Sequence, residues 1–535
     1  VLFIFAVVVC VVYEFRGIPM MAPDILTVQT ATSVMGNYTF KLTFEQYSVI
    51  LVCMAFFFTF LRLHEVKVTE KRVFHIAGFI VVALGCGLFT NQIILSDFME
   101  EHQINIRMFR PMESYQKYGG VLTFARSVGY AVVKKPEGYT TAKVDQIIQE
   151  YEKKSANAQQ STAKQYPNII TVVNETFADI KVLGDFKTNE DYMPYFHSLK
   201  KNCVTGYTYA SIVGGQTANT EFELLTGNTL GFLSAGTTAF QLYIHGQMPS
   251  LVSNLKAEGY SGNKAMHPFN PYNYNRPAVY KDFGFTDFID KFDFPKNVKR
   301  VREYISDEAN VDRIISEYEK NRKKTDQPFY MYNMTIQNHS PYDKDAANFK
   351  QPIKIESSKY DAEANRYLNL IKYSDDSLKQ LTSYFEKCKE PTIILFLGDH
   401  QPRLTDEFMN KITNGQYQTW SSEQMMKRYQ VPFVIWANYD IKEQHIEKTS
   451  MNYIQSILTK TAGVKMTGYQ RFLNEVRKEV PTITSQGYWG KNGKFYQIND
   501  KGSPYYGIIQ KYRMIQYNMM FDKKNRRDSF FEVSK

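Results

Sequence analysis

Thr392-Ile-Ile-Leu-Phe-Leu-Gly398 is an apolar run that ends directly at Asp399 and His400. Asn168-Ile-Ile-Thr-Val-Val-Asn174 is a second run of the same kind, and it ends at Glu175. Short and nearly continuous apolar runs are typical of strands buried on both faces of a parallel sheet. The two stretches therefore predict strands of an α/β domain with a mostly parallel central sheet.

Two further apolar runs, 259–266 and 329–337, stop at or near a histidine, His267 in the first case and His339 in the second. In open α/β sheets, ligands bind beyond the carboxyl ends of the strands. The four runs would bring their terminal polar residues to that edge. The pattern predicts a site there for a metal ion and a phosphate group.

Strand-like and helix-like segments alternate between these runs, which favours helices on both faces of the sheet. Residues 359–387 predict a helix, because apolar side chains recur at steps of three and four. Val431–Asn438 predicts another buried strand and Tyr506–Phe521 a late amphipathic helix. We expect this catalytic domain to occupy residues 167–535.

The N-terminal part has the composition of a membrane region. Residues 73–96 contain no Asp, Glu, Lys or Arg, and at about 1.5 Å per residue such a helix crosses a hydrocarbon core of about 30 Å. Residues 46–62 predict a shorter span, with Glu45 and Arg62 at the two interfaces. We interpret residues 1–13 as a truncated first span of a region covering 1–96; a cleaved signal peptide is the alternative.

Basic residues predict the orientation of these spans. The loop between the two complete spans carries Arg62, Lys67, Lys71 and Arg72. Positively charged loops stay in the cytoplasm, so we predict a multi-pass cell-membrane protein whose catalytic domain is extracellular. The net charge of +10 then favours anionic lipid or an anionic wall polymer as a partner over nucleic acid, unless it reflects only the basic character common in membrane proteins.

Residues 97–142 interleave aromatic and basic side chains. Both kinds favour the lipid headgroup layer, so we expect this segment to lie on the membrane surface. Residues 143–166 turn polar near the end of a predicted helix, and we interpret 97–166 as a surface segment followed by a linker helix. Outside the spans, Cys203 and Cys388 lack metal-site spacing; we expect two buried thiols, with a disulfide as the alternative.

Thr217 follows Gly214-Gly-Gln and precedes a stretch of helical composition. The two glycines allow a close backbone approach, and the threonine would stand at or near a helix N-terminus. Free amides and the helix dipole make that position attractive to a phosphate or an alkoxide. The alternative is that Thr217 is only a helix cap.

Glu175, Thr217, Asp399 and His400 together form an oxygen-rich set with one nitrogen, which suits Mn²⁺, Mg²⁺ or Zn²⁺. Metal coordination lowers the pKa of bound water from about 15.7 to about 7 and should act similarly on an alcohol. Taken singly, Glu175 could cap a helix, and Asp399 and His400 could be a hydrogen-bonded pair. As a set, they predict a metal-activated threonine nucleophile.

Four motifs carry a resemblance to a known family: Asn174-Glu175-Thr-Phe-Ala-Asp179, Gly215-Gln-Thr217-Ala-Asn-Thr-Glu221, Asn338-His339-Ser-Pro341 and Gly398-Asp399-His400-Gln-Pro402. Over about 167–470 the chain resembles the lipoteichoic acid synthases and phosphoglycerol transferases of the alkaline phosphatase and sulfatase superfamily. The resemblance implies an alkaline-phosphatase-like fold. It also implies Thr217 as nucleophile and Glu175, Thr217, Asp399 and His400 as ligands of one divalent ion, with Mn²⁺ expected.

The resemblance further implies that His267, Tyr274, Arg276 and His339 hold the glycerol phosphate, with Tyr274 standing where the family often has tryptophan. A planar guanidinium such as that of Arg276 can bind two phosphate oxygens at once. Without the resemblance, the loop 266–280 would be a proline-stiffened surface loop with an incidental histidine. Two residues depart from the pattern: Gln216 stands where some members have lysine, and Phe269 replaces an acidic residue.

The function implied is transfer of glycerol phosphate from phosphatidylglycerol to a polyglycerol phosphate or a cell-surface glycan, through a covalent phosphothreonine. A phosphoethanolamine transferase is an alternative with the same fold, although such enzymes typically have several disulfides. A sulfatase is another, although it needs cysteine or serine at the position of Thr217. An inactive membrane protein that binds wall polymer is an alternative from a different class.

Overall fold

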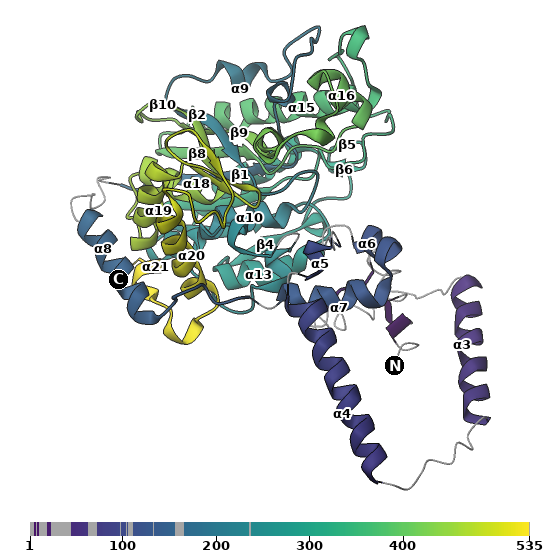
Figure 1. Ribbon diagram of the computed structural model, residues 1–535. Helices are drawn as coiled ribbons and strands as arrows, with labels where there is room; N and C mark the ends of the chain where they lie inside the picture. The colour runs from purple at the N-terminus through teal and green to yellow at the C-terminus, as the bar shows by residue number, and fades with distance from the viewer. Residues whose placement is uncertain are drawn as a thin grey trace. The chain divides into compact units, whose positions relative to one another are not determined.

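The computed structural model describes residues 5–6, 8–9, 19–22, 44–62, 72–96, 98–102, 104, 111–131, 133–155, 165–234 and 237–533. They form two compact units (Figure 1). The N-terminal unit comprises residues 1–134 and 234–242, and the sheet unit comprises residues 135–233 and 243–535.

The described helices of the N-terminal unit include two, α3 (Phe44–Arg62) and α4 (Arg72–Phe89), that overlap the predicted spans 46–62 and 73–96. The others are the π-helical turn η2 (Thr90–Leu95), α5 (Phe98–Glu101), α6 (Pro111–Tyr118), α7 (Gly120–Ala131) and, from the second part of this unit, α11 (Ala239–Leu242). Within the described residues, one helix, Ile76–Ile94, is long and apolar enough to cross a membrane. Large apolar side chains such as Phe56 and Phe79 are exposed on α3 and α4. Most of the predicted first span, 1–13, lies outside the described residues.

Helix α7 packs against the C-terminal end of this apolar helix. The Arg126 side chain on α7 donates a hydrogen bond of 2.8 Å to the carbonyl of Ile94. A Cβ atom at Gly129 would lie only 2.3 Å from the same carbonyl oxygen. The predicted surface segment is therefore joined to the end of the helix by close backbone packing.

The sheet unit contains an eight-stranded sheet in the order β10-β2-β9-β8-β1-β7-β3-β4. Its strands are β1 (Asn168–Asn174), β2 (Cys203–Tyr209), β3 (Ser261–Met266), β4 (Asp287–Ile289), β7 (Phe329–Met334), β8 (Thr392–Gly398), β9 (Gln430–Ala437) and β10 (Gln444–Ser450). Among the described strands of this sheet, β9 alone runs antiparallel to its neighbours. The predicted α/β fold with a mostly parallel central sheet is confirmed.

Two small sheets complete the strands. They are β5 (Arg300–Val301) with β6 (Tyr304–Ile305), and β11 (Thr482–Thr484) with β12 (Gly487–Trp489) and β13 (Phe495–Tyr496). The remaining helices are α8 (Thr141–Ser155), α9 (Pro194–Ser198), α10 (Thr217–Thr226), α12 (Leu251–Ala257), α13 (Arg276–Phe283), α14 (Asp307–Arg322), α15 (Ala362–Phe385), α16 (Asp406–Thr413), α17 (Ser422–Met425), α18 (Met451–Thr461), α19 (Gly468–Glu479), α20 (Tyr506–Met520) and α21 (Asp528–Phe531).

Both faces of the sheet are buried, as the unbroken apolar runs predict. Ile170 and Val172 of β1 belong to a core that also contains side chains of α14 and α15. Ile169 and Val173 point to the opposite face, because side chains alternate along a strand, and they are equally buried. The predicted helices 359–387 and 506–521 are confirmed as α15 and α20, each with slightly shorter bounds.

The register of β1 and β8 positions the candidate site. The two strands are parallel, with Asn174 opposite Gly398. The next residues, Glu175 and Asp399, therefore leave the sheet side by side. The sequence placed these two acidic residues at strand ends, and the register brings those ends together.

Helix α8 belongs with the sheet unit, although we predicted a linker up to residue 166. It contacts α19 and α20, and its Val144 and Ile147 are buried. Arg527 donates to both carboxylate oxygens of Asp145 at 2.6 and 2.8 Å. The helix looks polar in sequence because its apolar stripe is narrow, and the compact unit begins at residue 135.

Among the described residues, neither Cys203 nor Cys388 forms a disulfide. Cys203 is buried and Cys388 is half-buried. The prediction of two thiols is confirmed, with Cys388 less buried than expected.

Replacing Gly398 by alanine should destabilise the fold at the point where β8 meets the site. A Cβ atom there would lie 1.8 Å from the carbonyl oxygen of Phe177, so the backbone must shift. We expect Gly398→Ala to lower the free energy of unfolding by about 1–3 kcal/mol, as measured by denaturant unfolding. Gly415→Ala is the matched control, because a Cβ there meets nothing within 4 Å among the described residues. Equal stability of the two variants would contradict the expectation.

Candidate active site

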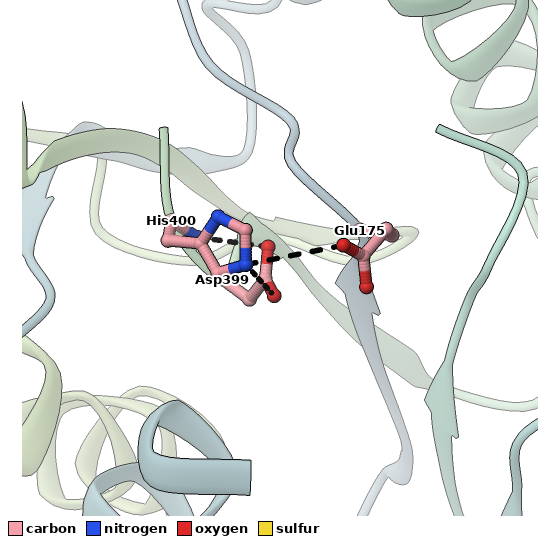
Figure 2. A group of neighbouring side chains, drawn as sticks. All are labelled: Glu175, Asp399 and His400. Atoms are coloured by element: carbon pink, nitrogen blue, oxygen red, sulfur yellow. Dashed lines mark hydrogen bonds and ion pairs between the residues drawn. The ribbon is translucent and has the colours of Figure 1, made fainter. Parts of the chain in front are cut away.

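Glu175, Asp399 and His400 converge at the carboxyl ends of β1 and β8 (Figure 2). One ligand atom from each residue lies within 4.8 Å of the others. The Nε2 atom of His400 is 3.2 Å from Oδ2 of Asp399 and 3.9 Å from Oε1 of Glu175. All three side chains are buried. We call these three residues the metal triad.

The hydrogen bonds of the metal triad show that it fits a cation. Nδ1 of His400 pairs with the carbonyl of Gln401 at 2.9 Å, so this nitrogen carries a proton, and in the neutral ring Nε2 presents a lone pair. Within the described residues, neither Nε2 of His400 nor Oδ2 of Asp399 has a hydrogen-bond partner. Two buried lone pairs that face each other repel, and a cation between them removes both the repulsion and the unsatisfied groups.

Electrostatics at Glu175 agree with this interpretation. Burial and the nearby Asp399 carboxylate raise the pKa of Glu175 well above its ordinary value, although the Arg276 guanidinium opposes the shift. A second positive charge beside Glu175 would keep its carboxylate ionised, as metal binding requires.

Backbone groups hold the metal triad in place. Oδ1 of Asp399 accepts hydrogen bonds from the amides of Thr176 at 2.7 Å and His400 at 2.8 Å. The amide of Glu175 donates to the hydroxyl of Thr335 at 3.0 Å, and the Thr176 hydroxyl donates to the carbonyl of Asn338 at 2.9 Å. The ends of β1, β7 and β8 are thus tied to one another, which fixes the ligand directions.

Thr217 lies beside the metal triad, at the first residue of α10 as predicted. Its hydroxyl donates to Oε2 of Glu175 at 3.4 Å. Gln216 before it is left-handed, with φ of 66°, and the Gly214 amide donates to the carbonyl of Gln401 at 2.9 Å. This turn sets the threonine hydroxyl and the N-terminus of α10 next to the metal triad.

The imidazole rings of His267 and His339 make the same kind of hydrogen bond as that of His400. Nδ1 of His267 pairs with the carbonyl of Met334 at 3.0 Å, and Nδ1 of His339 pairs with the carbonyl of Ser340 at 2.7 Å. Burial lowers the pKa of both imidazoles. Each side chain is therefore neutral near pH 7, with the proton on Nδ1 and a lone pair on Nε2.

Arg276 differs from the expected free guanidinium fork. Its Nε and Nη2 atoms both donate to Oε1 of Glu221, at 3.0 and 2.7 Å. Oε2 of Glu221 accepts hydrogen bonds from the hydroxyls of Tyr280 and Tyr332. The Nη1 atom of Arg276 takes no part in these two hydrogen bonds and can face a phosphate. The guanidinium also lies over the ring of Tyr274, 5.1 Å from its centroid, and burial raises the pKa of Tyr274 to about 12.

Two residues near the site were missed from the sequence. Glu221 follows Thr217 by one helical turn, and that spacing on a helix was the available signal. Arg302 donates to the carbonyls of Gln337, His339 and Pro341 at 2.8, 2.7 and 2.7 Å. No local sequence pattern could have predicted these contacts, because the loop 337–341 lies more than 30 residues after Arg302.

A protein-family profile described as Sulfatase matches residues 167–464, which is more than half of the chain. The chain belongs to the sulfatase family. Within the alkaline phosphatase and sulfatase superfamily it falls with the lipoteichoic acid synthase-like proteins.

Two curated relatives show the kinship of this sulfatase-family chain. It is 31% identical over 433 residues, 79% of this chain and 65% of the relative, to a Rhizobium meliloti protein named for cyclic beta-1,2-glucan modification. It is 23% identical over 382 residues, 67% of this chain and 55% of the relative, to a Staphylococcus saprophyticus lipoteichoic acid synthase. The chain thus spans less than two thirds of either curated relative.

A solved phosphoglycerol transferase of Streptococcus pyogenes, in complex with sn-glycerol-1-phosphate, shares the fold with a TM-score of 0.61 and 21% identity. The match covers 75% of this chain and 100% of that one. At 21% identity, this likeness shows a shared fold and nothing further about function.

Removing one ligand of the metal triad should empty the site. We expect the purified protein to retain about one divalent ion per chain after desalting, and Asp399→Asn to lose most of it, because the amide cannot balance the charge of the ion. Elemental analysis by plasma mass spectrometry measures this. Asp326→Asn, at an exposed aspartate, is the control, and equal metal content in the two variants would refute the assignment.

The buried pair of Glu221 and Arg276 should be costly to break. Both side chains are almost inaccessible to solvent, so Glu221→Gln leaves a buried positive charge without its partner. We expect a loss of about 3–5 kcal/mol in the free energy of unfolding. The double variant Glu221→Gln, Arg276→Met should recover part of that loss, and denaturant unfolding of all three proteins measures both effects. A single-variant loss below about 1 kcal/mol would show that the pair contributes little.

Proposed function

We propose that the protein is a membrane-anchored phosphoglycerol transferase. It would move glycerol phosphate from phosphatidylglycerol to a polyglycerol phosphate, as in lipoteichoic acid, or to a cell-surface glycan. The observation that carries the proposal is the Thr217 hydroxyl, which stands at the start of α10 and 3.4 Å from a carboxylate of the metal triad. The names of the relatives, a lipoteichoic acid synthase and a glucan modification protein, support the two acceptor classes.

The metal triad would hold one divalent ion, with Thr217 beside it; Mn²⁺ is the expected ion, and Mg²⁺ and Zn²⁺ also suit this donor set. When bound, such an ion supplies Lewis acidity, which lowers the pKa of an alcohol and neutralises phosphoryl charge. The carboxylates, the imidazole and the neighbouring hydroxyl fit that chemistry.

In the proposed reaction, each residue of the site has a separate role. In the first step, Oγ1 of Thr217 attacks the phosphorus of phosphatidylglycerol and diacylglycerol leaves, so that a glycerophosphoryl group remains on the threonine. The N-terminus of α10 and the Nη1 edge of Arg276 stabilise the phosphoryl oxygens. In the second step, Nε2 of neutral His339 or His267 accepts the proton of the attacking acceptor hydroxyl.

The membrane supplies the donor in this proposal. The apolar helix Ile76–Ile94 and the exposed apolar side chains of α3 fit a chain anchored in the bilayer. The basic residues of the loop after α3 support an extracellular position for the sheet unit. A lipid donor in the outer leaflet is then available without leaving the membrane.

Thr217 and the cysteines favour this proposal over its alternatives. A sulfatase nucleophile begins as cysteine or serine, and the chain has threonine. Among the described residues, no disulfide joins the two cysteines outside the spans, unlike the several expected for a phosphoethanolamine transferase. A wall-polymer-binding protein without catalysis has no need of a hydroxyl directed at a metal triad.

Loss of the Thr217 hydroxyl should abolish both half-reactions. With the full chain in vesicles that contain labelled phosphatidylglycerol, we expect Thr217→Ala to release diacylglycerol at least about 10³-fold more slowly than wild type. Mass spectrometry of the wild-type protein should find a glycerophosphoryl group on the peptide that contains Thr217. Thr217→Ser keeps a hydroxyl and should retain measurable turnover. Wild-type release rates in Thr217→Ala would remove threonine from the mechanism.

A further inference from the structure

Three partly exposed rings stand together beside the metal triad. The ring of Phe269 lies 6.3 Å from that of His339, with an angle of 21° between the planes. The ring of Tyr304 lies 6.1 Å from Phe269 and 5.8 Å from His339. All three side chains are half-buried. We call Phe269, Tyr304 and His339 the aromatic wall.

The aromatic wall has a rigid support. Tyr304 begins β6, next to the hairpin turn that carries Arg302. Arg302 has a left-handed backbone, with φ of 55°, and its guanidinium lies 5.2 Å from the centroid of the Tyr304 ring. The same guanidinium clamps the carbonyls on either side of His339. Such clamping holds the ring faces in place without a ligand, which is the preorganisation that binding requires.

The chemistry of the wall selects between the two acceptor classes. A polyglycerol phosphate carries a negative charge in each repeat and would call for exposed basic side chains in the wall itself, whose members are two uncharged rings and a neutral imidazole. Arg302 is only 9% exposed, and its hydrogen bonds to the loop are made to carbonyl oxygens. Phe269 stands where the family resemblance led us to expect a carboxylate. The faces of the rings are instead suited to the C–H groups on one face of a pyranose, which are drawn to the negative face of an aromatic ring.

We propose that the aromatic wall binds a hexopyranose ring of a neutral glycan acceptor, so that Phe269 and Tyr304 determine acceptor specificity. The inference rests on the proposed transfer. A sugar hydroxyl would attack the phosphorus of the glycerophosphoryl group, the new P–O bond would form as the bond to Oγ1 of Thr217 breaks, and the hydroxyl proton would pass through His339 to the released threonine oxygen. The products are a glycerol phosphate diester of the sugar and free Thr217.

Binding tests the inference without catalysis. Titration calorimetry of the full chain in detergent would use a β-1,2-linked glucose oligosaccharide and, separately, a glycerol phosphate oligomer. We expect wild type to bind the oligosaccharide more tightly, and Phe269→Leu and Tyr304→Leu to weaken that binding by about tenfold, because leucine keeps apolar volume but removes the ring face. Tyr360→Leu, at an exposed tyrosine that is not part of the wall, should bind like wild type, and thermal unfolding confirms that the variants are folded.

The outcomes separate the two proposals. If wild type prefers the glycerol phosphate oligomer, binds neither probe, or binds the oligosaccharide as tightly as folded Phe269→Leu and Tyr304→Leu do, the sugar platform is overturned. Release of diacylglycerol from labelled phosphatidylglycerol by wild type, measured without acceptor, reports on the transferase proposal alone. Oligosaccharide binding that depends on the wall, in a protein that releases no diacylglycerol, would uphold the platform and reject the transferase.

Discussion

The rest of the site depends on one constraint, which is that carboxylate oxygens and an imidazole nitrogen share a single buried space. Oδ2 of Asp399 and Nε2 of His400 face each other at 3.2 Å, and both are buried without a hydrogen-bond partner among the described residues. Glu175 adds a second carboxylate to the same space. Parallel pairing of β1 and β8 brings these groups together, and the amide of Thr176 secures them. A divalent cation would be contacted by all three side chains at once, which suits this donor set.

Helix α10 makes hydrogen bonds with the metal triad and carries Thr217, the proposed nucleophile. Its first residue, Thr217, contacts Glu175, and Thr220 donates to the carbonyl of Asp399 at 2.8 Å. One turn after Thr217, Glu221 fixes Arg276 and neutralises part of its charge. Thr217, Asp399 and Arg276 are therefore held together by hydrogen bonds through one helix. Such rigidity suits a reaction in which positioning and electrostatic stabilisation provide most of the rate.

Much of the site could be predicted from sequence, because strand ends in a parallel sheet meet at one edge. Glu175, Asp399 and His400 lie there, and Thr217 begins its helix as expected. The orientation of Arg276 could not be predicted, since its partner Glu221 lies on another helix and only packing brings the two together. The contacts of Arg302 could not be predicted either, because its partners at 337–341 are distant in sequence. The packing of α8 was also not evident, because few of its residues are apolar and its sequence is like that of a linker.

The proposed chemistry requires one divalent ion between the metal triad and Thr217. Anomalous X-ray diffraction from a crystal of the protein soaked in Mn²⁺ tests it most directly. We expect one strong anomalous peak about 2.0–2.2 Å from oxygens of Glu175 and Asp399 and from Nε2 of His400, with the Thr217 hydroxyl facing it. A map in which the three side chains keep their arrangement but no peak lies between them would show that the triad does not hold a metal.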